Sequence, residues 1–176
     1  MVLRLLVLAV LALALGTASA SARQPAAGQI GRIDHVADGD TVDLTNGEKV
    51  RLVQIDTPEV YFTPECYGEQ ASAITKRLLP PGTLVRLLPE PATDSDDQYG
   101  RLLRYVIRVR DGMNVNVQLV RVGAAAPYFY DYRRGRYASQ IDRLARAARA
   151  HHLGLWGACP HTPYDPNHKV AARPLS

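Results

Sequence analysis

The sequence predicts an α+β protein, a five-stranded β-barrel with three α-helices. Two observations support this fold class. Five short stretches have the composition and spacing of strands, and a single helical stretch separates the third from the fourth. Two more helical stretches follow the fifth strand, and the chain contains no internal repeat. An α+β sandwich is the main alternative.

Three strands are predicted at the start of the folded region, at 30–35, 41–45 and 50–55. Valine, isoleucine, leucine and threonine recur in these stretches, as is typical of strands. An Asp-Gly-Asp turn at 38–40 separates the first two, and an Asn-Gly turn at 46–47, a strong hairpin signal, separates the second two. These turns predict an antiparallel meander.

The spacing of apolar residues then changes, which predicts a helix over 67–79. Ala71, Ile74 and Leu78 would lie on one face of this helix, and two prolines at 80–81 would end it.

Two further strands, at 83–88 and 102–109, are predicted to complete the sheet. Helices over 114–122 and 137–152 follow them, each with an apolar stripe. Five short strands interrupted by one helix are typical of the small Greek-key barrel called the OB fold, with the late helices packed against the barrel.

The two ends of the chain are predicted to lie outside the domain at 29–159. Residues 1–20 contain a basic residue, an apolar run and small residues ending Ala-Ser-Ala, which is the order of a secretory signal cleaved after Ala20. A membrane anchor is the alternative. Residues 21–28 resemble a flexible lead-in, and 160–176 a flexible proline-rich tail. We therefore expect a secreted or periplasmic monomer without stable membrane association.

The charge of the mature chain is slightly positive. The full sequence has 21 Lys and Arg against 17 Asp and Glu, and loss of Arg4 with the signal leaves twenty against seventeen, a net charge of +3. This excess permits an anionic partner without requiring one. Arginine outnumbers lysine, which suits bidentate contacts with phosphate, although genomic base composition can produce the same bias.

The chain has two cysteines, Cys66 and Cys159. Export to an oxidising compartment favours a disulfide between them over two free thiols. The bridge would close a loop of about 92 intervening residues, and the entropy of closing such a loop is worth on the order of 4–5 kcal/mol.

Acidic residues gather at one end of the predicted meander. Asp38 and Asp40 lie in its first turn, and Asp56 follows its third strand, so the alternating strand directions bring them to the same end of the sheet. Two such carboxylates, with a backbone carbonyl and waters, would suit Ca²⁺ better than Zn²⁺, because no set of His and Cys has zinc-ligand spacing. The alternative interpretation is that the aspartates only form the turn.

Three other side chains near this end could act on a phosphodiester. Arg51 lies on the apolar face of its strand, Arg101 stands at the start of the fifth strand, and Glu59 follows a proline-stiffened turn. Two arginines could neutralise a pentacovalent phosphate, and a glutamate could act as general base for the attacking water. Alternatively, Glu59 is a solvated surface group and the arginines are ion-pair partners of nearby carboxylates.

Six motifs stand in order along the chain: ADGDTV (37–42), RLVQIDTPE (51–59), YGEQASAITK (67–76), DQYGRLLRYV (97–106), NVNVQLVRVGAA (114–125) and GLWG (154–157). Together they resemble the staphylococcal-nuclease-like family of thermonucleases, over about 30–157. The resemblance implies an OB barrel with three helices. It also implies a Ca²⁺-dependent phosphodiesterase that cleaves DNA and RNA with little sequence preference and leaves 3′-phosphate ends.

The resemblance assigns three catalytic residues, three calcium ligands and three nucleotide-contacting tyrosines. These are Arg51, Glu59 and Arg101; Asp40, Asp56 and the backbone carbonyl of Thr57; and Tyr99, Tyr128 and Tyr130. Stacking on tyrosines would favour single-stranded or frayed substrates. The alternative is a non-catalytic OB-fold module that binds nucleic acid, and retention of the five charged side chains in this set argues for an enzyme.

Two departures from the family pattern concern substrate binding. Gln98 stands where the family prototype has a lysine, and the loop at 60–66 is shorter and lacks the prototype's lysines. Fewer phosphate contacts predict weaker substrate binding and a shallower salt dependence, with the chemistry retained. The prototype has no cysteines, so the bridge between Cys66 and Cys159 would be an addition.

Overall fold

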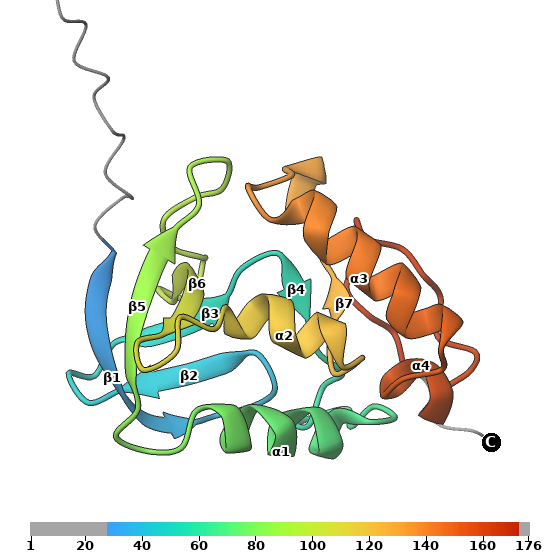
Figure 1. The fold of residues 1–176 in the computed structure, drawn as a ribbon, viewed down its shortest axis with the longest axis horizontal. Helices are drawn as coiled ribbons and strands as arrows, with labels where there is room; N and C mark the ends of the chain where they lie inside the picture. The colour runs from blue at the N-terminus through green and yellow to red at the C-terminus, as the bar shows by residue number, and fades with distance from the viewer. Residues whose placement is uncertain (1–27, 173–176) are drawn as a thin grey trace, which may run out of the picture.

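Five strands close into a barrel in the computed structural model, which describes residues 28–172 (Figure 1). Their order around the barrel is β1-β2-β3-β6-β5, and the pairing of β1 with β5 closes it. All neighbours are antiparallel except β3 and β6. The bounds are β1 (Gln29–Val36), β2 (Thr41–Leu44), β3 (Lys49–Leu52), β5 (Leu84–Pro89) and β6 (Leu102–Arg108). The five-stranded barrel predicted from the sequence is confirmed.

Three helices of two turns or more accompany the barrel. They are α1 (Gly68–Leu78), α2 (Val115–Arg121) and α3 (Ala138–Ala150). In Figure 1, α2 lies between α1 and α3, and it contacts both of them as well as β6. Asn114 caps α2 by accepting a hydrogen bond from the backbone N–H of Val117 at 3.2 Å, and Gly123, with a φ of 71°, follows its end. One short helix that the sequence did not predict, α4 (Leu155–Ala158), follows α3.

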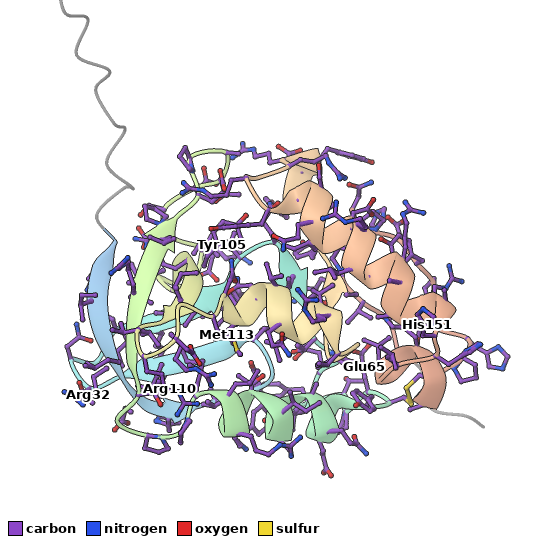
Figure 2. All side chains as sticks on the ribbon, in the orientation of Figure 1. Arg32, Glu65, Tyr105, Arg110, Met113 and His151 are labelled. Atoms are coloured by element: carbon purple, nitrogen blue, oxygen red, sulfur yellow. A yellow bond between two sulfur atoms is a disulfide. The ribbon has the colours of Figure 1, made fainter. Side chains whose placement is uncertain are left out.

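The core lies inside the barrel and continues under the helices. Ile33, Val50 and Leu87 are fully buried in the barrel, and Leu119 of α2 and Ile141 of α3 join them. Tyr105 of β6, which is buried and labelled in Figure 2, packs edge to face on the ring of Tyr137, the residue before α3. The ring centroids are 4.7 Å apart. This continuous apolar contact fixes the helices relative to the barrel.

The third predicted strand, 50–55, is divided in two. β3 ends at Leu52, and the chain turns through Gln54, which has a φ of 67°. The next residues form β4 (Ile55–Asp56), which pairs with β7 (Ala126–Pro127) outside the barrel. The side chain of Gln54 supports the turn, since it donates to the carbonyl of Arg133 at 2.7 Å and accepts from the backbone N–H of Gly135 at 2.8 Å. The prediction of one continuous strand at 50–55 was therefore wrong. The break depends on the hydrogen bonds of Gln54 to a distant segment, and the alternation of side chains along a strand gives no sign of them.

The described part of the C-terminal segment, 160–172, packs against the domain. Val170 and Ala172 are buried with Trp156 in a second apolar cluster. Tyr164 donates a hydrogen bond to Asp142 of α3 at 2.6 Å. This arrangement differs from the flexible tail predicted for 160–176, because proline-rich composition reveals a lack of helix and strand but not the contacts that hold an irregular segment.

The predicted signal at 1–20 lies outside the described residues, as does the lead-in up to residue 27. Within residues 28–172, no helix has the length and apolar character needed to cross a membrane.

Cys66 and Cys159 form a disulfide, as the sequence predicts. The bond lies beside α4 in Figure 2 and joins the segment before α1 to the residue that follows α4. It therefore connects two parts of the fold that are 93 residues apart in the sequence.

Replacing both cysteines with serine is expected to lower the free energy of unfolding by on the order of 2–5 kcal/mol, because the unfolded chain regains the entropy lost when the loop was closed. Denaturant unfolding of the oxidised protein and of the Cys66→Ser/Cys159→Ser variant measures the difference. Reductant should shift the transition of the parent protein and leave that of the variant in place. Equal midpoints for the two oxidised samples would show that the bridge does not stabilise the fold.

Candidate active site at the mouth of the barrel

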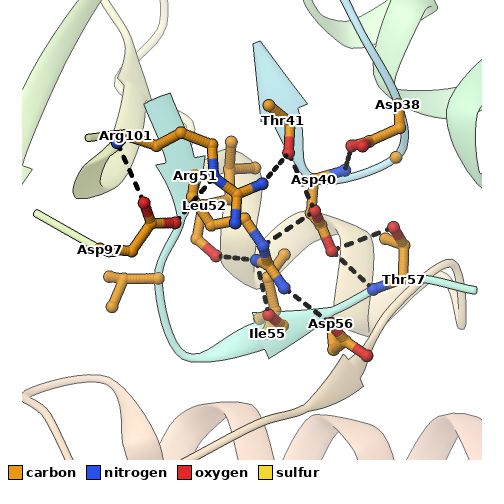
Figure 3. A network of polar contacts seen from close by, with 12 residues as sticks. Asp38, Asp40, Thr41, Arg51, Leu52, Ile55, Asp56, Thr57, Asp97 and Arg101 are labelled. Atoms are coloured by element: carbon orange, nitrogen blue, oxygen red, sulfur yellow. Dashed lines mark hydrogen bonds and ion pairs between the residues drawn. The ribbon is translucent and has the colours of Figure 1, made fainter. Parts of the chain in front are cut away.

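Two aspartates from different parts of the chain meet at one end of the barrel. Asp40 directly precedes β2, Asp56 ends β4, and both are buried, with 5% and 3% of their surfaces exposed. The guanidinium of Arg51 lies between them, with Nε 3.1 Å from Oδ1 of Asp40 and Nη2 2.6 Å from Oδ1 of Asp56 (Figure 3). The structure thus brings together the two carboxylates that the meander predicted would converge.

The turn after β3 explains why Arg51 can be buried. Its Nη1 donates to the carbonyl of Leu52 at 2.6 Å and to that of Ile55 at 2.9 Å, on either side of the turn (Figure 3). With both aspartates, these carbonyls give the guanidinium four partners, so the cost of burying its charge is offset. An arginine on an apolar strand is therefore possible here because the strand ends one residue later.

Burial and mutual repulsion shift the titration of the acidic residues around Arg51. Burial raises the pKa of Asp56 to about 7; Arg51 opposes this rise and Asp40 adds to it. Burial also raises the pKa of Asp38, and the charge of Asp40 adds to the effect. Burial disfavours the charged form of Arg51, but Asp40 and Asp56 outweigh it and raise the pKa of the guanidinium. Burial beside another carboxylate thus favours the neutral forms of Asp38 and Asp56, and the charge of Arg51 opposes this effect.

The Asp-Gly-Asp turn is held in place by residues on two other elements. The backbone N–H and the hydroxyl of Thr57 donate to Oδ2 of Asp40 at 2.8 and 3.1 Å (Figure 3). The hydroxyl of Thr75, on α1, donates to the carbonyl of Gly39 at 2.6 Å. A Cβ at Gly39 would lie 2.4 Å from the hydroxyl oxygen of Thr57, so the turn requires glycine. Sequence reasoning found the turn but missed Thr75, for which no local pattern gives a signal.

The donors at this site fit a hard divalent cation. Asp40 and Asp56 supply carboxylate oxygens on either side of the Arg51 guanidinium, so the position already accepts a positive charge. Ca²⁺ binds six to eight oxygens in irregular geometry. Within 28–172, no three side chains of His, Cys, Asp or Glu are grouped so that they could hold a metal. A calcium ion would therefore take most of its ligands from waters, a backbone carbonyl and substrate, and it would share the two aspartates with Arg51.

Arg101 reaches Thr41, the residue that pairs with Arg51 between β2 and β3. Its Nε is 2.7 Å from Oδ2 of Asp97, and its Nη1 donates to the hydroxyl of Thr41 at 3.3 Å (Figure 3). Burial opposes ionisation of Asp97, but hydrogen bonds from Arg101 outweigh burial and lower the pKa of this carboxyl. Asp97, which sequence reasoning did not single out as the partner, therefore holds the second arginine beside the first.

A cleft of about 400 Å³ opens in front of the two arginines. Five of the nine predicted site residues, the two arginines and the three tyrosines, line it together with one lysine. These six are Arg51, Arg101, Tyr99, Tyr128, Tyr130 and Lys169. The rings of Tyr128 and Tyr130 lie edge to face with centroids 6.2 Å apart, and Tyr99 is 75% exposed. The exposed tyrosine faces could stack on bases.

Glu59 lies at the exposed rim of the site. Its Oε1 is 3.6 Å from Nζ of Lys169, and its negative charge contributes to the raised pKa of Arg51. The side chain of Glu59 is thus paired to a lysine of the C-terminal segment. Glu59 is not among the residues that line the cleft, and neither are the three proposed calcium ligands. Lys169 was missed from the sequence because the segment that contains it was predicted to be a flexible tail.

Comparison with known proteins gives concordant matches. The family model described as "Staphylococcal nuclease homologue" matches residues 49–158. A thermonuclease of Staphylococcus intermedius is 35% identical over 130 residues, which are 70% of this chain and 74% of that protein. An uncharacterized endonuclease of Escherichia coli is 34% identical over 143 residues, which are 79% of this chain and 85% of that protein.

Some relatives are much longer than this chain. The endonuclease YhcR of Bacillus subtilis (strain 168) is 34% identical over 145 residues, which are 72% of this chain but 11% of that protein. Two other B. subtilis endonucleases are matched over 43% and 60% of their lengths.

Proposed function

This chain belongs to the staphylococcal nuclease family, and we propose that it is a secreted, Ca²⁺-dependent endonuclease. It hydrolyses DNA and RNA with little sequence specificity and leaves 3′-phosphate ends. The observation that supports this most strongly is the position of Arg51, which is bonded to two buried aspartates and also lines a cleft with Arg101. Three tyrosines line the same cleft.

The acidic part of the site holds the cation. Asp40, Asp56 and the backbone carbonyl of Thr57 are the proposed calcium ligands. Calcium would supply Lewis-acid stabilisation of a phosphate oxygen and polarise a bound water. The hydrogen bonds from Thr57 fix one oxygen of Asp40, so the aspartate presents the same face whether or not substrate is bound.

The arginines and the glutamate act on the scissile phosphate. Arg51 and Arg101 donate to its non-bridging oxygens, and these bonds strengthen as negative charge develops in the pentacovalent state. Glu59 accepts the proton of the attacking water. The 5′ oxygen leaves and takes a proton from solvent water, which gives one product end with a 3′-phosphate and another with a 5′-hydroxyl.

The tyrosines determine the form of the substrate. Tyr99, Tyr128 and Tyr130 offer ring faces and hydroxyl groups around the cleft, and stacking on a ring tolerates any base. Bases must be unpaired to stack in this way, so single-stranded or frayed DNA and RNA are the preferred substrates.

A signal at 1–20, removed after Ala20, would direct the protein out of the cytoplasm. The exported protein would act as a monomer. The disulfide between Cys66 and Cys159 supports this location, because such bonds persist in oxidising compartments.

Purified protein is expected to release acid-soluble nucleotides from single-stranded DNA and RNA, and more slowly from duplex DNA, when Ca²⁺ is present. Chelation of the metal should stop the release, and excess Ca²⁺ should restore it. Products should accept a 5′ label from polynucleotide kinase without prior phosphatase treatment, since their 5′ ends are hydroxyls. Full activity in chelator would refute calcium dependence. A gel shift of DNA with Ca²⁺ but without shortening would identify a non-catalytic binding module.

A further inference from the structure

The C-terminal segment 160–172, the C-terminal strap, is attached to Cys66 at both of its ends. It begins after Cys159, which is bonded to Cys66 through the disulfide. It ends at Ala172, whose carbonyl accepts a hydrogen bond from the backbone N–H of Cys66 at 2.9 Å. Ala172 is fully buried. The strap is therefore a closed loop with a defined position on the domain.

Between these attachments the C-terminal strap reaches the candidate active site. The carbonyl of Pro166 accepts from the backbone N–H of Phe129 at 2.6 Å, next to the tyrosines of the cleft. The backbone N–H of Val170 donates to Oδ2 of Asp56 at 2.8 Å. In Figure 1 the strap, in red, runs from α4 alongside α3 toward β7. Backbone contacts thus fix the chain on both sides of Lys169.

Lys169 is the cation of the cleft with the weakest bond to the protein. Arg51 is held by two aspartates and two carbonyls, and Arg101 by a 2.7 Å pair with Asp97. Arg133, which also lines the cleft, has a 3.2 Å pair with Asp94. Among residues 28–172, the only ion pair of Lys169 is a 3.6 Å contact with Glu59, and the two side chains are 61% and 51% exposed. An exposed pair of this length contributes little to stability, so an incoming phosphate can take its place.

We propose that Lys169 binds a substrate phosphate beside the scissile one, so that the C-terminal strap completes the nucleic-acid cleft. This inference rests on the proposed function, since it adds a contact to the same site. An ammonium group suits the task because it attracts phosphate as a point charge without demanding one geometry. Lysine occurs only at 49, 76 and 169 in the chain, and Lys169 is the one that lines the cleft.

The geometry favours substrate binding over inhibition by the C-terminal strap. The backbone N–H of Val170 donates to Oδ2 of Asp56, whereas Arg51 contacts Oδ1. The strap therefore orients the carboxylate without displacing the arginine. Lys169 stands on the wall of the cleft, and about 400 Å³ remains open in front of the arginines. A blocking segment would fill that space.

The test compares Lys169→Ala with the matched variant Lys49→Ala. Lys49 is also 61% exposed and also pairs with a carboxylate at 3.6 Å, that of Asp43, but it lies outside the cleft. Fluorescence anisotropy with a labelled oligothymidylate in chelator measures binding without cleavage. Loss of one exposed charge contact should weaken binding by about fivefold in Lys169→Ala and lower the slope of log K against log salt by about 0.7. Lys49→Ala should bind like the parent, and Lys169→Arg should keep most of the affinity.

Cleavage kinetics separate this inference from the proposed function. With Ca²⁺, Lys169→Ala should raise KM by a similar factor, because bound substrate and transition state both lose the phosphate contact. The variant also frees Glu59 from its ion pair, so a change in kcat reports on Glu59 and the change in KM reports on the phosphate contact. Equal binding by the two alanine variants would overturn the role of Lys169 while the parent still cleaves DNA. A parent that binds through Lys169 but never cleaves would overturn the nuclease proposal instead. Tighter oligonucleotide binding by Lys169→Ala than by the parent would overturn the inference in favour of an inhibitory strap.

Discussion

Replacing Glu59 with glutamine is expected to reduce kcat for DNA hydrolysis by about 10²- to 10⁴-fold, the usual contribution of a general base. Glutamine has nearly the same shape but cannot accept the proton of the attacking water at neutral pH. The fold should be unaffected, because the carboxylate is half exposed and its ion pair with Lys169 is long. Initial rates on labelled single-stranded DNA with saturating Ca²⁺ measure the effect.

A suitable control is Glu69→Gln, since Glu69 is an exposed carboxylate in the first turn of α1. This variant should retain the parent's kcat. Oligonucleotide binding by Glu59→Gln in chelator should be unchanged or slightly tighter, because the change also frees Lys169. If Glu59→Gln cleaved at the parental rate, another group would have to activate the water.

Replacing Arg51 with methionine is expected to lower the free energy of unfolding by about 3–5 kcal/mol, because it leaves buried charges without their partner. Asp40 and Asp56 would face each other without the guanidinium, and the carbonyls of Leu52 and Ile55 would lose a donor. Loss of the phosphate contact should also reduce kcat/KM by at least about 10²- to 10³-fold. Denaturant unfolding and cleavage assays measure the two effects separately.

The stability deficit of Arg51→Met should depend on pH. Burial already raises the pKa of Asp56 to about 7, and without Arg51, which opposes this rise, it should lie further above its value in the unfolded chain. Acids with a raised folded pKa are tolerated when protonated and cost stability as the pH rises, so the deficit should be smaller near pH 5 than near pH 8. A deficit that is equal at both pH values would contradict the idea that unpaired carboxylates cause it.

The variant Arg51→Lys separates charge from geometry. It keeps a cation between Asp40 and Asp56, so its loss of stability should be clearly smaller than that of Arg51→Met. An ammonium cannot contact two carboxylates and a phosphate in the way a planar guanidinium can, so activity should remain low. Near-normal activity in Arg51→Lys would show that only the charge of Arg51 matters.

Local patterns were sufficient to predict the barrel and its three longer helices. The turn residues at 38–40 and 46–47 mark the meander, and Asn114 and Gly123 mark the ends of α2, because capping and hairpin turns depend on residues close in the sequence. The break at Gln54 could not be predicted in this way. Its positive φ is supported by hydrogen bonds to a segment about eighty residues away.

The candidate site was predicted only in part, because some of its contacts depend on strand order and others on residues that show no local pattern. The direction of the strands in a meander is enough to bring Asp40 and Asp56 to one end of the sheet. Arg51 lies on the third strand of that meander, so its contact with both aspartates agrees with the predicted strand order. Thr75 and Asp97, which hold the turn and the second arginine, gave no local signal that assigned them these roles.

The sequence by itself determined the fold class, the pairing of the two cysteines and the convergence of the two aspartates, because each follows from residue type and strand order. Only the tertiary structure decided where the C-terminal strap lies. Its position depends on the disulfide at Cys66, on the buried side chains of Val170 and Ala172, and on one backbone hydrogen bond to Asp56. Contacts between residues more than a hundred positions apart have no periodic pattern in the sequence, so the place of Lys169 beside Glu59 became visible only in three dimensions.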